Sequence, residues 1–244
     1  MLASYMPKFN NLVVSFLPLV FIMDFGREEE SNLERFNQYV MNDIPIRLIR
    51  ISDMKFVGRD DVRRYFQRSF SAHLGDPSEL VKYAILSHRW NIGEPTYEDM
   101  RSGRARRQPG YQKLKKFCEM ARAIYHVEFA WSDTCCIDKR SSTEIDESIR
   151  SMFRWYRNAD ICIIHLAQSM MIQDILRDEW TRRGWTLQEL LAPRRIKLFN
   201  KDWMPMTHAE NDKSQKETEV MKALEKATDI PHKDLWSLSQ VRSG

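Results

Sequence analysis

The chain has 244 residues, of which 43% are hydrophobic and 30% are charged, and its formal net charge is +4 at pH 7. These are globular values, and the length allows one domain of roughly 150–200 residues plus an extension. The positive charge is scattered except at 101–107, which we interpret as a solvated loop, and at 182–183 and 194–195. No aromatic residues interleave with it, so nucleic-acid binding is not expected.

The cysteines do not form a disulfide framework. There are four of them, and Cys135 and Cys136 are adjacent, while Cys118 and Cys162 lie in apolar segments typical of a core. This usage suits a reducing compartment, and we expect a cytoplasmic location. There is no CxxC motif and the histidines are dispersed, so no metal site is predicted.

Residues 1–43 are predicted to be an N-terminal extension with a short helix around 33–41. The apolar run 12–23 is shorter than the ~20 residues that cross a bilayer, and Pro18 interrupts it. Lys8 alone is a poor start for a signal peptide. We expect a buried segment or a loosely attached extension, and no membrane association.

The rest of the chain alternates between predicted strands and helices. IPIRLIRI (44–51) has the two-residue period of a half-buried strand, and residues 60–75 carry phenylalanines at helical spacing. Further strands are predicted at 83–87, 128–132, 161–166 and 195–199. Helices are predicted at 110–126, after Ser141, at 169–177, from Trp185 and at 213–229. This order predicts an α/β fold with a parallel sheet and helices on both faces.

A capping box is predicted at the start of the helix after Ser141. Ser141 is followed three residues later by Glu144, the spacing at which each side chain bonds to the other's backbone. The helix then shows apolar residues at helical spacing: Ile145, Ile149, Met152, Phe153 and Tyr156.

The segment 180–199, WTRRGWTLQELLAPRRIKLF, contains the most informative pattern. Glu189 follows Trp185 by four residues, so on a helix both side chains share one face, while Leu187 and Leu191 can bury on the other. Pro193 ends the helix near Ala192. A carboxylate beside an aromatic ring, just before a strand, could bind or cleave a polar ligand. From these residues alone, a surface glutamate beside a half-buried tryptophan is the simpler interpretation.

Other candidate residues follow the predicted strands, because ligands bind beyond the carboxyl ends of parallel strands. They are Ser87, His88, Arg89 and Trp90 after the first strand of this series, Asp133 to Cys136 after the second, and His165 at the third. GxGxxG, GxxxxGK[ST] and GxSxG motifs are absent. A nucleophile pair of Cys135 or Cys136 with His88 or His165 is conceivable, but buried structural thiols are the simpler interpretation. Asp133 is more simply interpreted as a loop cap.

Four segments together resemble the fungal heterokaryon-incompatibility (HET) family. They are YAILSHRW (83–90), GYQKL (110–114), FAWSDTCCIDKRSSTEIDESIRSMFRWYRNADICIIHL (129–166) and RGWTLQELLAPRRIKLFNKDW (183–203). The resemblance implies a HET domain at 44–230 and a tail at 231–244. Asn91 stands where the family often has glycine, which puts the local loop shape in doubt.

The HET domain is itself distantly similar to the Toll/interleukin receptor (TIR) domain. The resemblance implies a flavodoxin-like core at about 83–203 and NAD as a possible substrate, cleaved at the nicotinamide–ribose bond. It implies that Glu189 is catalytic, with no cofactor or metal. It also implies a set of binding residues: Ser87, His88, Arg89, Trp90, Asp133 and Trp185.

Three functional hypotheses follow from this resemblance. The first is a self/non-self recognition effector that promotes cell death, with NAD hydrolase activity. The second is a non-enzymatic signalling adaptor that acts by homotypic assembly with itself or other signalling domains. The third is a decayed or truncated family member. The first requires Glu189 to be partly exposed in a cleft, with residues 87–90 and Asp133 within reach.

Overall fold

The computed structural model describes residues 17–70, 75–214, 218–231 and 233–235. Its centre is a six-stranded sheet in the order β2-β1-β4-β3-β5-β6. The strands are β1 (Arg47–Arg50), β2 (Lys55–Gly58), β3 (Tyr83–His88), β4 (Phe129–Trp131), β5 (Ile161–His165) and β6 (Ile196–Phe199). The α/β fold class predicted from the sequence is confirmed, and each predicted strand is present.

The sheet is parallel over four of its strands. β4, β3, β5 and β6 run parallel, whereas β1 pairs antiparallel with both β2 and β4. Within the parallel part, the first strand along the chain is β3, the second lies on one side of it, and the third and fourth lie on the other. This is the flavodoxin-type order, in which successive strands are added first on one side of the starting strand and then on the other, so that the order switches between β3 and β5.

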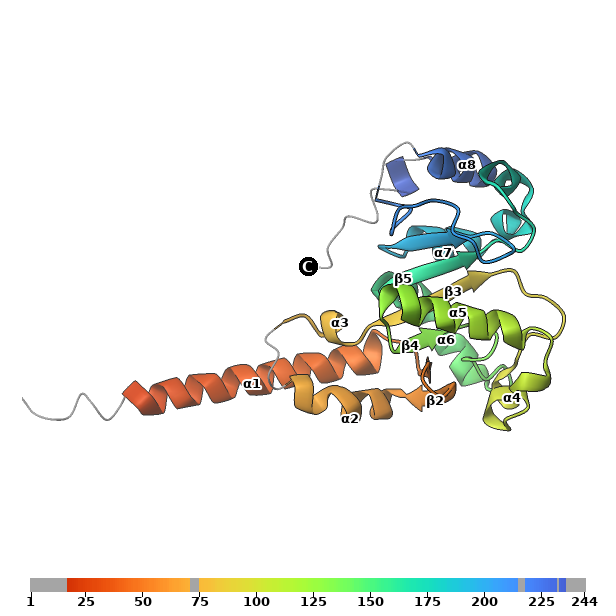
Figure 1. Ribbon diagram of the computed structural model, residues 1–244. Coiled ribbons are helices and arrows are strands. Elements are labelled where there is room, and N and C mark those ends of the chain that lie inside the picture. Colours follow the sequence, from red (N-terminus) through yellow and green to blue (C-terminus); the bar gives the residue numbers. More distant parts are fainter. Residues whose placement is uncertain (1–16, 71–74, 215–217, 232, 236–244) are drawn as a thin grey trace, which may run out of the picture.

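Helices flank this sheet (Figure 1). Because parallel strands are joined by right-handed crossovers, α5 and α6 lie on opposite faces. The α-helices are α1 (Leu17–Asn42), α2 (Arg59–Phe70), α3 (Pro77–Leu80), α4 (Tyr97–Arg101), α5 (Tyr111–Tyr125), α6 (Ser142–Asn158), α7 (Thr186–Leu191) and α8 (Glu219–Thr228). Short 3-10 helices occur at η1 (Ala105–Arg107), η2 (Ile172–Arg177) and η3 (Glu179–Arg182).

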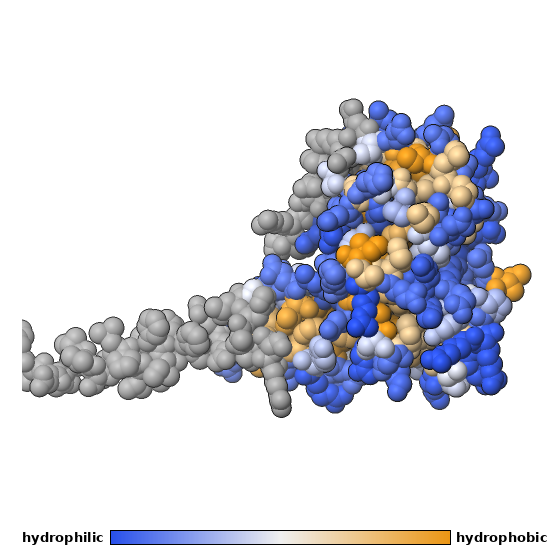
Figure 2. Space-filling model, in the orientation of Figure 1, coloured by the Kyte–Doolittle hydropathy of each residue, from blue (hydrophilic) through white to orange (hydrophobic). Residues whose placement is uncertain are grey.

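The core lies on both faces of the central strands. Every residue of β3, β4 and β5 is buried, as expected for apolar strands covered by helices on both sides. Trp131 of β4 packs edge-on against Trp155 and Tyr156 of α6, at ring-centroid distances of 5.9 and 6.0 Å. On the face that is visible in Figure 2, hydrophilic side chains surround small apolar areas.

The start of α6 confirms half of the predicted capping box. The Ser141 hydroxyl accepts a hydrogen bond from the Glu144 backbone N–H. The Glu144 carboxylate does not return the bond to Ser141. It instead accepts two hydrogen bonds from Arg47, at 2.7 and 3.2 Å, and one from the backbone N–H of Asp138. It therefore ties strand β1 to helix α6.

The N-terminal region differs from the prediction in length. A short helix was expected around residues 33–41, but α1 has 26 residues and its first half projects beyond the sheet (Figure 1). Its C-terminal half is packed, because Phe36 stacks on Phe70 of α2 with centroids 4.6 Å apart. The apolar run 12–23 lies partly outside the described residues, and no helix within those residues is long and apolar enough to cross a bilayer. Strand β2 was not predicted.

Candidate functional site

The carboxyl ends of β3 and β5 meet where the strand order reverses. Ser87 of β3 lies beside Ile164 of β5, and His88 beside His165. A crevice at this position is where ligands bind in open α/β sheets. Helix α7 and the loop after β4 reach the same edge, so the candidate residues from distant parts of the sequence are brought together here.

Helix α7 faces the opposite way from the prediction. Its buried residues are Thr186, Glu189 and Leu190, whereas Leu187 is 49% exposed and Trp185 is 48% exposed. The prediction treated Trp185 as part of the helix, but the helix begins at Thr186 and Trp185 is its N-cap. Glu189 is only 3% exposed, so the partial exposure that the hydrolase hypothesis requires is not met in this structure.

Glu189 can be buried because polar partners surround its carboxylate. Ser87 donates to Oε2 at 2.5 Å, and the Trp180 indole N–H lies 2.7 Å from the Ser87 hydroxyl and 3.2 Å from Oε2. Arg183 donates from Nη1 to Oε2 at 3.1 Å and from Nη2 to Oε1 at 3.0 Å. A bidentate arginine and two neutral donors can offset much of the desolvation that a buried carboxylate suffers.

The pKa of Glu189 is nevertheless raised. Burial is the main cause, and the charge of Asp133 acts in the same direction. The charge of Arg183 and the hydrogen bond from Ser87 oppose this increase and favour the ionised form. The charge of Arg183 is thus the main influence that favours the ionised carboxylate.

A cleft of about 560 Å³ lies in front of this ion pair. It is lined by Arg89, Trp90, Asp133, Ile137, Lys139, Ile145, Ser148, Ile149, Met152, Arg183, Trp185 and Glu189. The predicted apolar stripe of α6 supplies one wall, through Ile145, Ile149 and Met152. The buried residues of α6 are instead Ser148, Ser151, Trp155 and Tyr156, of which Ser148 also borders the cleft. The cleft therefore combines an apolar wall with charged and aromatic side chains.

Two charged side chains contact the Trp90 ring in the cleft. Its indole N–H donates to Asp133 Oδ2 at 2.9 Å, and the Lys139 ammonium lies 3.6 Å from the ring centroid. Burial lowers the pKa of Lys139, while Asp133 acts to raise it. Arg89 forms an exposed ion pair with Glu179 at 2.6 Å. Two carboxylates and three cations thus share the cleft with two indole rings.

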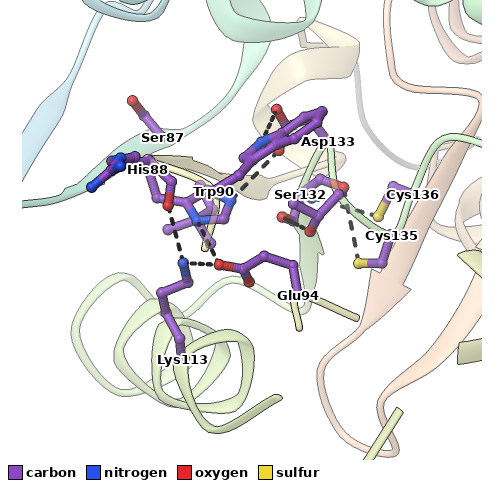
Figure 3. Close-up of polar contacts among 12 residues, drawn as sticks. Ser87, His88, Trp90, Glu94, Lys113, Ser132, Asp133, Cys135 and Cys136 are labelled. Carbon is purple, nitrogen blue, oxygen red and sulfur yellow. Dashed lines mark hydrogen bonds and ion pairs between the residues drawn. The ribbon is translucent and has the colours of Figure 1, made fainter. Parts of the chain in front are cut away.

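Behind Trp90 and Asp133 lies a buried polar network (Figure 3). The His88 ring is buried, with Nε2 3.5 Å from Asp133 Oδ1 and Nδ1 3.8 Å from Glu94 Oε1. Lys113 of α5 reaches Glu94 and donates to the Arg89 carbonyl at 3.2 Å. Burial would raise the pKa of Asp133, but His88 and the Trp90 indole outweigh it and hold that pKa below its usual value.

The predicted site residues therefore occupy different layers. Arg89, Trp90, Asp133, Trp185 and Glu189 line the cleft. Ser87 lies beneath it and contacts Glu189, and His88 lies behind it near Asp133. Within the described ranges, the Asp133 carboxylate accepts a hydrogen bond from the Trp90 indole and none from its own loop, so the interpretation as a loop cap was wrong.

The alternative cysteine–histidine pair has no support in the geometry. The Cys135 thiol is buried, and a hydrogen bond with Cys136 together with burial raises its pKa well above the usual value. A protonated thiol is a poor nucleophile. His165 stacks on Trp203 at 4.2 Å, and burial lowers its pKa to about 4. Within the described ranges, no cluster of three or more His, Cys, Asp or Glu side chains could hold a metal ion.

Sequence reasoning missed three residues of the site. Arg183 and Trp180 lie beside the predicted glutamate in sequence, but nothing in their spacing showed that both would reach its carboxylate. Lys139 lies in the loop after β4, and its position over Trp90 depends on the fold. The double arginine at 182–183 beside a predicted carboxylate was the available signal.

The fold and the cleft define an α/β domain with a doubly wound, flavodoxin-type sheet and, at its carboxyl edge, a cleft of apolar, aromatic and charged side chains. Residues 83–171 match the family model described as heterokaryon incompatibility protein (HET). This segment therefore matches the HET family, and the resemblance seen in the sequence is confirmed for it.

A curated relative supports the same assignment. The vegetative incompatibility protein HET-E-1 of Podospora anserina is 43% identical over 137 residues, covering 51% of this chain. The chain spans 10% of the length of that relative. No solved structure is significantly similar to the chain. The family match ends at residue 171, before Arg183 and Glu189.

Proposed function

We propose that this chain is a self/non-self recognition effector of heterokaryon incompatibility that promotes cell death, and that its domain hydrolyses NAD. The name of the Podospora relative supports the first part. The second part depends on one observation, which is the Glu189 carboxylate at the wall of a cleft that also holds two tryptophans and three cations. We further propose a cytoplasmic location and association with copies of itself or with other signalling domains.

The composition of the cleft suits a dinucleotide. Its volume of about 560 Å³ lies within the ~300–1,000 Å³ range of small-molecule sites. The exposed indoles of Trp90 and Trp185 can stack on flat heterocycles. Arg89, Lys139 and Arg183 can neutralise the two phosphate charges, because guanidinium groups match phosphate oxygens in pairs.

The reaction requires little acid catalysis. The bond between ribose C1′ and the nicotinamide nitrogen breaks, and its electron pair leaves with nicotinamide, which departs as a neutral molecule. The ribose carbon becomes oxocarbenium-like, as in glycoside hydrolysis. An ionised Glu189 beside it would stabilise that positive charge. Water then attacks C1′ and loses a proton, which gives ADP-ribose.

The flavodoxin-type order supports the proposed likeness to TIR domains.

Nicotinamide release from NAD tests the enzymatic proposal. The wild-type protein, at high concentration or artificially clustered, is expected to release nicotinamide, whereas Glu189→Ala and Glu189→Gln are expected to be inactive. Glu147→Gln is the matched control, because Glu147 is half-exposed, is paired with Arg59 and lies outside the cleft lining. Activity in Glu189→Gln would show that the negative charge is dispensable. No release by the clustered wild type would reject the hydrolase.

A non-enzymatic adaptor is the second candidate. It is favoured by the ion pair with Arg183, which engages both oxygens of Glu189. Half-exposed apolar side chains at Ile149 and Phe153 of α6 and Leu187 of α7 offer a surface for self-association. For an adaptor, Phe153→Glu should abolish concentration-dependent association in sedimentation, and Glu189→Gln should still trigger cell death.

A further inference from the structure

The two oxygens of Glu189 have different environments. Oε2 accepts from Ser87, Trp180 and Arg183. Among the described residues, Oε1 accepts a hydrogen bond only from Arg183 Nη2. If the guanidinium moved away, Oε2 would keep its two neutral donors and the carboxylate would stay in place. Oε1 would lose its hydrogen-bond partner.

Arg183 is the more accessible partner of this pair. Its side chain is 21% exposed against 3% for Glu189, and both line the cleft. The other cleft cations are engaged differently: Arg89 pairs with Glu179 at the surface, and Lys139 lies over the Trp90 ring. Arg183 is thus the cation that an incoming anion could reach while it still holds the buried carboxylate.

We propose that Arg183 is the anion-binding residue of the cleft and that a ligand phosphate competes with Glu189 for its guanidinium. Binding of the phosphate draws Arg183 from Glu189 and frees Oε1 toward the ligand, while Ser87 and Trp180 hold Oε2. The carboxylate becomes available only after an anionic ligand has bound. This inference rests on the proposed function only for the choice of a nucleotide as ligand, and Arg183 is a positioning residue in it.

The exchange has a measurable proton signature. The titratable groups that act on Glu189 are Arg183, Asp133, Tyr156 of α6 and Cys162 of β5. Burial raises the pKa of the tyrosine and the cysteine well above their usual values, so both remain neutral. When Arg183 moves away from Glu189, the negative charge of Asp133 remains nearby, and the pKa of Glu189 rises. ADP has no positive nicotinamide ring, so a carboxylate freed by ADP takes up a proton.

Calorimetry with ADP in buffers of different ionisation enthalpy tests the proposal, because ADP cannot be cleaved at a nicotinamide bond. The ligand phosphate also titrates near about pH 6, so proton uptake is counted here as the excess over that of Glu189→Gln. Wild-type protein should take up an excess fraction of a proton, more at about pH 6 than at about pH 8. Glu189→Gln should bind ADP about tenfold more tightly, since an amide competes less for Arg183. Arg183→Gln should lose about tenfold in affinity, and Arg183→Lys should lie between. Pyrophosphate should give the same uptake as ADP.

Arg154→Gln is the matched control. Arg154 is half-exposed and, like Arg183, forms an ion pair, in this case with Asp43, but it does not line this cleft. It should bind ADP with wild-type affinity and proton uptake. The proposal is overturned if wild-type protein binds ADP without proton uptake, if it binds neither ADP nor pyrophosphate, or if Glu189→Gln does not bind ADP more tightly. These results do not depend on whether NAD is cleaved.

Discussion

Replacing Arg183 with methionine removes the counterion of a buried carboxylate. Breaking a fully buried ion pair typically costs about 3–5 kcal/mol. Arg183 is partly exposed, and Ser87 and Trp180 still donate to Glu189 in the variant. We therefore expect a smaller loss, about 2–3 kcal/mol in the free energy of unfolding at neutral pH.

The pH dependence identifies Glu189 as the origin of this loss. Its folded-state pKa is already raised by burial, and Arg183→Met raises it further. An acid with a raised folded pKa binds protons more readily in the folded state. It therefore lowers the free energy of unfolding increasingly as pH rises from its unfolded pKa, ~4.3, through the folded pKa. The difference between variant and wild type should thus be largest at neutral pH and should shrink at about pH 5.

Urea unfolding at the two pH values measures this difference. The same substitution made in a Glu189→Gln background should cost less than about 1 kcal/mol, because no buried charge is left unpaired. If Arg183→Met costs the same at both pH values and in both backgrounds, the loss comes from packing of the arginine stem and our reasoning about the ion pair is refuted.

Three further predictions concern other parts of the structure. Ser87→Ala should lower the free energy of unfolding by about 2 kcal/mol, because the Trp180 indole and Glu189 both lose a buried partner; urea unfolding would show it, and an unchanged midpoint would contradict it. Lys213 is buried beside the carbonyls of Leu191 and Pro193, and burial lowers its pKa to about 7. The unfolded chain then binds more protons above that pH, so stability should rise by about 2 kcal/mol between about pH 7 and pH 9, and Lys213→Met should remove this rise. Trp90→Ala should weaken ADP binding about tenfold in calorimetry, whereas Ile92→Ala, at a fully exposed side chain, should not; equal effects would exclude stacking on Trp90.

The fold was predictable because its signals are local. A short, nearly all apolar run such as ICIIH favours a strand buried on both faces, and the strand–helix alternation then restricts the topology. The cap at Ser141 and the stop at Pro193 follow from backbone geometry. Strand β2 was missed because KFVG is short and lacks clear alternation, and its pairing with β1 supplies the missing information.

The site was only partly predictable because its geometry depends on contacts between distant residues. The rule for parallel sheets located the correct edge and three of the residues that line the cleft, Arg89, Trp90 and Asp133, while the helix pattern and the family resemblance supplied Trp185 and Glu189. Helical periodicity could not show that Glu189 is buried, because Ser87, 102 positions away in the sequence, supplies one of the donors that permit it. The apolar stripe of α6 was visible in the sequence, but not that it lines a cleft while Trp155 packs against Trp131 of the sheet.

The antiparallel strand β1 has a practical consequence for dissecting this protein. It covers the outer edge of β4, where Ile49 pairs with Ala130 and Arg50 with Phe129. A fragment trimmed to the family match, which begins at residue 83, would leave that edge with open backbone donors and acceptors. Such an edge recruits strands from other molecules. Aggregation of a trimmed fragment would therefore report a missing protective strand and should not be mistaken for signalling assembly.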